Sequence, residues 1–291
     1  ACLKKILPVY CSACRYHVYY YYGDLIHSSA DLLLFPYLVL TSGHALLLSK
    51  DMQSGIVFEK QDTLKFFHQM YDRYLEQVSS FGVVMNNLPT QLSYFHNIRA
   101  DMEQNYCFQM LPCLTFGIPD YFFDKYIYPE IPSRDKLIAM LMDYVHSIRK
   151  RFTEHPVRFI FSEDGLQRFL ETGRIPEYPP AVYRPFELSD RIVLIRQFLK
   201  FCPPNGLCML KCTIGDLDNE LFMYVNPRNG YLMFPSSEPD QLICLDITEP
   251  GLLHGFCDFC EHLDKDLFYT ETEAYSLISS LLDKTEQKKG S

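Results

Sequence analysis

One cassette occurs twice in this sequence and limits the folds that the chain can adopt. Each copy contains a strand pair joined by a turn, a further short strand and an amphipathic helix. The first copy covers residues 39–77 and the second 221–263, with turns at Gly43 and Gly230. The flanking runs are rich in Val, Leu, Tyr and Phe, which is typical of pleated strands. Either an internal duplication or the general pattern of strand-helix packing can account for the similarity.

Both cassette helices carry an apolar stripe whose members are seven and then four residues apart. The stripe consists of Leu64, Tyr71 and Leu75 in the first copy and of Leu252, Phe259 and Leu263 in the second. This spacing places the three side chains on one helix face. In the second copy Thr248, Glu249 and Pro250 signal a helix N-terminus, because they combine an acceptor side chain, a carboxylate and a fixed φ.

These patterns predict a mixed α/β (α+β) fold with a cassette near each end, pseudo-symmetric if the cassettes are duplicates. We expect an N-terminal sheet-and-helix half over residues 1–116 and a C-terminal sheet-and-helix half over residues 201–291. Residues 117–200, which contain proline-rich loops, are expected to form a helical middle. Its helices are predicted over 134–152, 164–172 and 188–201, and the second of these ends at Gly173.

Composition indicates a globular, cytoplasmic protein. The 291 residues are 48% hydrophobic and 22% charged, and no apolar run approaches the roughly 20 residues of a membrane-spanning helix. We therefore expect no membrane association. The chain begins with Ala1 rather than Met and has no signal-peptide pattern, so we expect a fragment that lacks an upstream domain.

The charge pattern does not favour direct DNA binding. The net charge is −9, and the basic residues are scattered apart from Arg149, Lys150, Arg151 and two lysines near the C-terminus. A DNA-binding surface requires clustered Lys and Arg side chains. We expect contact with DNA only through an upstream domain.

Eleven cysteines, an odd number without a regular framework, indicate reduced thiols. Cys11 with Cys14 and Cys257 with Cys260 have the spacing of zinc ligands, provided that the two ends of the chain meet. Core packing is the alternative for the second pair, because free Cys is commonly buried. We predict no metal and no cofactor.

Motifs for catalysis are missing: the sequence contains no GxSxG, HExxH, GxxxxGK or GxGxxG. We therefore predict a non-catalytic protein, with an enzyme site assembled from distant residues as an alternative. A tyrosine-rich strand over residues 15–25 offers one candidate ligand wall, because Arg15, His17, Tyr19 and Tyr21 share a face. An ordinary buried strand explains the same pattern.

The stretch RFIFSEDGLQRFLETGRIPEYPPAVYRPFELSDRIVLIRQFL, residues 158–199, resembles the long C-terminal regions of helix-turn-helix transcriptional regulators from Gram-positive gut bacteria. The resemblance extends to both cassettes. Their layout also resembles sensor domains of phospholipase-D-like fold, which have two pseudo-symmetric halves. The HxKxxxxD motif of that enzyme fold is absent, since His262 is followed by Lys265.

The resemblance implies a ligand-sensing or assembly region of a transcriptional regulator. A small-molecule effector would shift the populations of two conformations and so act on an upstream DNA-binding domain. We also expect a homodimer. A purely structural interaction module is the remaining alternative.

Overall fold

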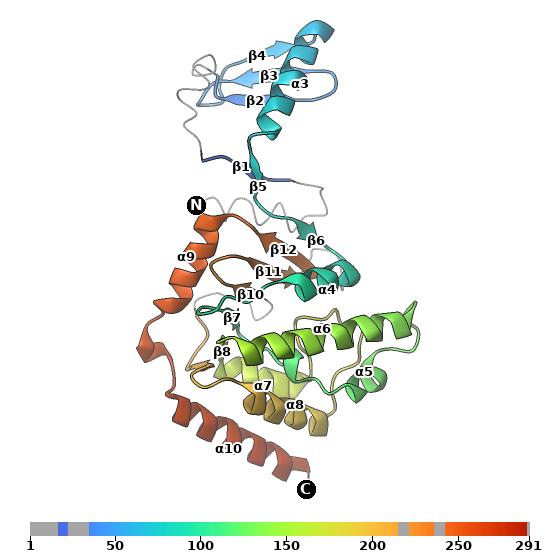
Figure 1. Ribbon diagram of the computed structural model, residues 1–291, viewed down its shortest axis with the longest axis vertical. Helices are drawn as coiled ribbons and strands as arrows, with labels where there is room; N and C mark the ends of the chain where they lie inside the picture. The colour runs from blue at the N-terminus through green and yellow to red at the C-terminus, as the bar shows by residue number, and fades with distance from the viewer. Residues whose placement is uncertain (1–16, 23–34, 215–220, 236–241, 290–291) are drawn as a thin grey trace. The chain divides into compact units, whose positions relative to one another are not determined.

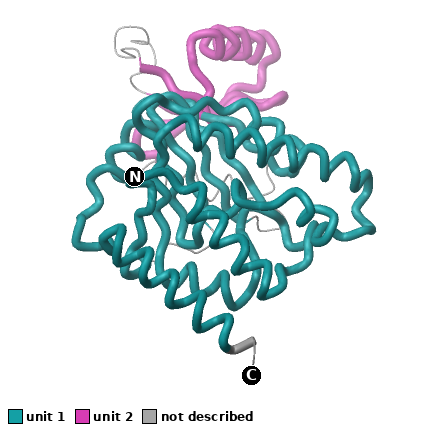
Figure 2. Tube along the Cα trace, turned by 60° about the horizontal axis from the view of Figure 1, so that its bottom comes forward, with its two compact units in different colours: residues 1–16, 82–291 teal, residues 17–81 magenta. Residues whose placement is uncertain are grey.

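The computed structural model describes residues 17–22, 35–214, 221–235 and 242–289. It divides the chain into two units, one formed by residues 1–16 and 82–291 and the other by residues 17–81 (Figure 2). We call the second one the small unit and the first one the large unit. The predicted mixed α/β class is confirmed, because helices and mixed sheets alternate along the chain (Figure 1).

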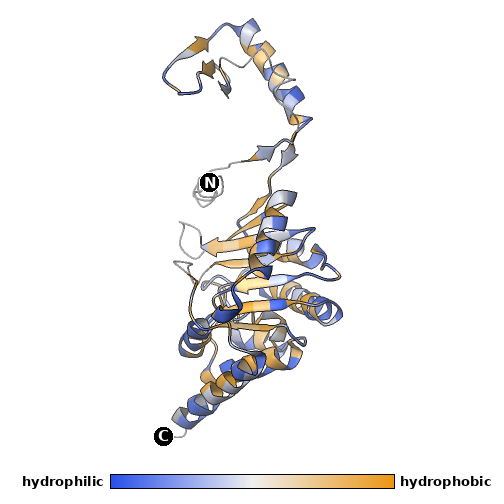
Figure 3. Cartoon of the chain, turned by 90° about the vertical axis from the view of Figure 1, so that its left-hand side faces the viewer, coloured by the Kyte–Doolittle hydropathy of each residue, from blue (hydrophilic) through white to orange (hydrophobic). Residues whose placement is uncertain are grey.

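The large unit is built on a seven-stranded sheet in the order β6-β12-β11-β10-β7-β8-β9. Three strands are parallel, namely β7 (Tyr106–Gln109), β8 (Arg158–Ser162) and β9 (Leu207–Leu210). The others pair in antiparallel fashion and are β10 (Phe222–Val225), β11 (Gly230–Pro235), β12 (Leu242–Ile247) and β6 (Val84–Met85). The strands are predominantly apolar (Figure 3), as expected for a sheet that is buried on both faces.

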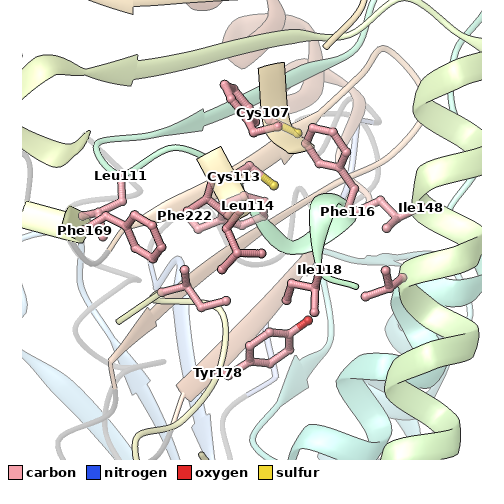
Figure 4. Packing of buried hydrophobic residues seen from close by; sticks show 14 of the residues in the cluster. Cys107, Leu111, Cys113, Leu114, Phe116, Ile118, Ile148, Phe169, Tyr178 and Phe222 are labelled. Carbon is pink, nitrogen blue, oxygen red and sulfur yellow. The ribbon is translucent and has the colours of Figure 1, made fainter. Parts of the chain in front are cut away.

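Helices of the large unit contribute to one hydrophobic core on one face of the sheet (Figure 4). They are α4 (Leu88–Asn97), α5 (Tyr121–Tyr126), α6 (Arg134–Glu154), α7 (Glu163–Thr172), α8 (Leu188–Phe201) and α10 (Glu271–Lys289). Cys107 of β7 points into this core, whereas its neighbour Phe108 points to the opposite face. There the Phe108 ring centroid lies 5.5 Å from that of Phe259 in α9 (Pro250–Glu261).

The small unit contains a three-stranded antiparallel sheet of β2 (Tyr37–Leu40), β3 (Ala45–Leu48) and β4 (Gly55–Phe58). The helix α3 (Gln61–Leu75) follows. A separate two-stranded sheet pairs β1 (Tyr19–Tyr20) with β5 (Ser79–Ser80). The first cassette thus forms three antiparallel strands followed by a helix.

The second cassette has the same element order, β10, β11, β12 and α9. The first and second strands of the two copies are joined by 41–44 and 226–229, and the second and third by 49–54 and 236–241. The helix follows after 59–60 and 248–249. Each pair of connections has equal length, and this equality supports the duplication.

The predicted helix stripes are only partly correct. Leu64 of the predicted stripe is buried, whereas in α9 the buried residue is Leu253 and not the predicted Leu252. Leu64 and Leu253 are each the fourth residue of their helix. Tyr71 and Phe259 are instead 44% and 40% exposed. The buried side of α9 consists of Leu253, Cys257 and Cys260, one position away from the predicted stripe. Two adjacent stripes of this helix are apolar, and contact with the sheet selects one of them.

The expected boundaries at 116/117 and 200/201 differ from the observed division. Strands from all three expected segments hydrogen-bond in one sheet, because β7 lies between β8 and β10. The expected helical middle therefore contributes β8 to that sheet instead of standing between two sheets. Its helices are correctly placed, since α8 spans Leu188–Phe201 and α7 ends before Gly173, whose φ is 65°.

Candidate functional site

The tyrosine-rich strand is short, and its predicted ligand wall is exposed. His17, Tyr19 and Tyr21 share the exposed side of this segment, with Tyr19 at 45% and Tyr21 at 41% exposure. Arg15 lies outside the described residues. Exposure alternates over residues 17–20, but Tyr22 is 75% exposed, so the predicted alternation of faces does not extend to the end of the described segment. Ligand binding by these residues stays a prediction.

The second cysteine pair is buried on α9, at the sheet face opposite the hydrophobic core of the large unit. Cys257 and Cys260 are 6% and 3% exposed, and burial raises the pKa of Cys257 to about 11. The partner pair, Cys11 and Cys14, lies outside the described residues. Within the described part of the chain, no group of three or more His, Cys, Asp or Glu side chains is arranged to hold a metal ion.

A polar pocket of about 350 Å³ lies where the three parallel strands of the large unit begin. It is lined by the loops that enter β7, β8 and β9, through Glu103, Pro156 and Asn205 among others, and by the last residue of α9, Glu261. We call this the entry pocket. Its volume lies within the range of small-molecule sites.

Asn105 fixes the floor of the entry pocket. Its buried side chain donates hydrogen bonds to the carbonyls of Asp101, at 2.8 Å, and Pro156, at 3.0 Å. The amide oxygen accepts from the backbone N–H of Asp101 and from the Tyr224 hydroxyl, at 2.8 and 2.9 Å. One side chain thus ties the loop before β7 to the loop before β8, and the pocket is pre-formed.

Three side chains converge on the wall of the entry pocket. Arg158, the first residue of β8, lies with Nη1 3.1 Å from Oε2 of Glu261. The hydroxyl of Tyr106, the first residue of β7, donates to the same oxygen. The Arg158 guanidinium also lies over the Tyr106 ring, 5.9 Å from its centroid, at a distance suited to a cation–π contact.

These contacts set the charge of Glu261. The hydrogen bond from Tyr106 and the nearby Arg158 lower the pKa of Glu261, while burial and Glu261 raise the pKa of Tyr106. The carboxylate ends a helix, where the macrodipole disfavours negative charge. Its two partners offset that cost, so the pocket presents a stable carboxylate beside a guanidinium.

Asn205 forms the rim of the entry pocket in an uncommon backbone conformation. Its φ is 59°, in the left-handed region that Asn tolerates better than most residues. The Asn205 backbone N–H donates to Oε1 of Glu271 at 3.2 Å, and Gly206 N–H donates to the Pro203 carbonyl at 2.9 Å. The turn that holds Asn205 is therefore fixed at both sides.

A second polar cluster lies at the opposite end of β7, but it is closed. Glu177 is 6% exposed, with Gln109 Nε2 3.5 Å and Thr115 Oγ1 3.4 Å from its Oε1. Glu177 Oε2, Gln109 Oε1 and the Tyr178 hydroxyl have no hydrogen-bond partner among the described atoms. Burial raises the pKa of Glu177 to about 7. Because Glu177 is almost fully buried, this cluster is a titratable group inside the protein and not an open ligand site.

Sequence reasoning missed the residues of the entry pocket. Arg158 and Glu261 come from different elements and meet only through the order of the sheet. Two local signals existed: a charged residue begins an otherwise apolar strand, and an acidic residue ends a helix, where a base is favoured. Neither signal identifies its partner.

Comparison with known proteins assigns no family to the chain. No protein-family model matches it. Neither a curated protein nor a solved structure with significant similarity was found. Among the described helices, none has the length and apolar character needed to cross a membrane.

Proposed function

We propose that this chain is a ligand-binding effector region of a transcriptional regulator, and that the entry pocket holds the effector. The observation that carries the proposal is the convergence of three strand-entry loops and the end of α9 on one pre-formed polar pocket. A guanidinium and carboxylates lie within it, together with amide side chains. This set is suited to a small molecule that bears both a carboxylate and an ammonium group, such as an amino acid or a dipeptide.

The strand-entry position also offers a route for a conformational signal. Glu261 belongs to α9, which follows directly on β12, while Arg158 begins β8. A ligand that competes for Arg158 or Glu261 would change how the end of α9 is held against the sheet. Any such coupling is limited to the difference in affinity of the ligand for the two arrangements.

Binding is tested by isothermal titration calorimetry of the full chain against a panel of L-amino acids and dipeptides. For the ligand that binds, Arg158→Gln is expected to weaken affinity tenfold or more, since a hydrogen bond to a charged group contributes about 1.5–3 kcal/mol. The matched control is Arg196→Gln. Arg196 also pairs with a glutamate, Glu286 at 2.8 Å, and is similarly exposed, 56% against 46% for Arg158.

Equal losses in both variants, or no binding by any panel member, would count against the entry pocket as the effector site. The regulator role has a separate test. A helix-turn-helix domain encoded upstream of residue 1 supports it, whereas a nucleotide-binding or metal-binding catalytic domain there contradicts it.

A further inference from the structure

The sheet of the small unit is covered by its helix on one face. α3 packs Leu64 and Phe67 against Ala45, and these three residues form the buried centre of the unit's core. Partly buried residues surround them: Leu38, Leu40, Leu47, Phe58 and Met70. Because side chains alternate along a strand, the remaining strand residues point to the other face.

That other face is apolar and exposed. It carries Tyr37, Val39, Leu46, Leu48 and Val57, and we call it the bare face. Tyr37 is 41%, Val39 49% and Val57 58% exposed, while the two leucines are half-buried. The register places Val39 opposite Leu46 and Leu46 opposite Val57, so the apolar side chains are contiguous.

In the second cassette, the sheet face that corresponds to the bare face is buried. The corresponding strand positions are Phe222, Tyr224, Tyr231, Met233 and Cys244, and all five are buried in the core of the large unit. Both faces of the cassette sheet are therefore covered in one copy. In the other copy the same apolar pattern is exposed in the part of the chain that the structure describes, and an exposed apolar patch is a candidate interaction surface.

We propose that the bare face is the contact between two copies of this chain, packed sheet against sheet about a twofold axis. Such an axis brings the same patch onto itself, so a charge near the axis would face its own copy. The five side chains of the bare face carry no charge. Aligned sheets of this kind pack about 10 Å apart through interdigitating apolar side chains.

Charges beyond the ends of the bare face favour an antiparallel arrangement of the two copies. The exposed Glu59 lies past one end, 3.4 Å from His44. Lys50 lies past the opposite end, in the turn after β3, where the neighbouring Asp51 is held by Ser49 Oγ at 2.5 Å. With strands reversed, Glu59 of one copy approaches Lys50 of the other.

The size of the bare face determines the strength of the contact. Exposed apolar patches with a function typically measure about 300–600 Å², and a stable dimer buries about 800 Å² per partner. The bare face offers five side chains, fewer than the roughly 20–30 residues per side of such a dimer. We therefore expect a reversible dimer that dissociates on dilution.

The test is sedimentation velocity of the full chain over a wide concentration range. Val57→Lys and Val39→Glu are each expected to shift the monomer–dimer equilibrium at least tenfold towards monomer. Both residues are about half exposed, so the fold tolerates the change. Phe66→Lys is the matched control, because Phe66 is 55% exposed on α3 and should leave the equilibrium unchanged.

Mixing the Val57→Lys chain with a Val57→Glu chain provides a second measurement. Association is expected to return in the mixture and not in either chain alone, since opposite charges then share the patch. A monomer at all concentrations, or a dimer that survives both bare-face substitutions, would overturn the proposal. A dimer that the Phe66 change weakens equally would place the contact elsewhere and overturn it too.

Discussion

Among the described residues, no Lys, Arg or His side chain forms an ion pair with the carboxyl group of Glu177. The titratable groups near it are the Cys113 thiol and the phenols of Tyr144, Tyr178 and Tyr183, whose raised pKa values keep all four neutral at pH 7. Burial therefore disfavours the carboxylate and raises the pKa of Glu177 in the folded state. A charge is tolerated here only at the expense of stability.

Stability is consequently expected to fall as pH rises through the range of this group. The pKa of Glu177 is about 7 when folded, against an ordinary value of 4.5. The folded state thus retains a proton that the unfolded state has lost. The contribution of protonated Glu177 to the free energy of unfolding is therefore complete below pH 4.5. It is lost by about pH 7, which lowers the stability by an amount on the order of 3 kcal/mol.

Urea unfolding at several pH values measures this effect. Glu177→Gln keeps the size of the side chain, stays neutral and supplies a donor that can reach Gln109 Oε1. The difference in unfolding free energy between variant and wild type should grow in favour of the variant from pH 4.5 to 7. A difference that does not change with pH would contradict the assignment.

At the scale of single elements, helix α7 depends on a glycine at its third residue. A Cβ at Gly165 would lie 1.8 Å from the Met110 carbonyl oxygen, on the segment that leaves β7. Ser162 Oγ accepts a hydrogen bond from Gly165 N–H at 3.0 Å and donates one to the Met110 carbonyl at 3.1 Å. It therefore links the helix to the segment that leaves β7. The close approach of helix and strand excludes any larger residue.

Two glycine substitutions distinguish the effect of this close packing on stability from the effect of helix propensity. Gly165→Ala is expected to destabilise the protein by about 3 kcal/mol or more through overpacking. Gly255→Ala, in α9, meets no atom within 4 Å and should stabilise by about 1 kcal/mol. Urea midpoints measure both, and a stable Gly165 variant would show that α7 can move away from β7.

Helices and hairpins were predictable because their signals are local. The bounds of α8 follow from its periodicity, and the end of α7 follows from Gly173. The predicted buried side of α9 differs from the observed one by one residue. Cys257 and Cys260 are small, and the large Phe259 indicated the wrong stripe. The entry pocket depends on which strands become neighbours, and no periodicity within one element specifies this.

At the scale of the whole molecule, the two units differ in the size of their cores. The small unit is centred on Ala45, Leu64 and Phe67, whereas an extended cluster fills the large unit. We expect amide hydrogen exchange to be faster in β2, β3, β4 and α3 than in β7, β10 and β11. Mass spectrometry after deuteration measures this, and equal protection would contradict separate cooperative units.

The pairing of β7 with β10 has a consequence for how the chain is made. Tyr106–Gln109 bonds to Phe222–Val225, so one edge of β7 stays open until translation has passed the later strand. At ordinary elongation rates this interval is on the order of ten seconds. During it the growing chain exposes an apolar strand edge, the kind of surface on which aggregation begins. The nascent protein is therefore expected to depend on chaperones more than its finished sheet suggests.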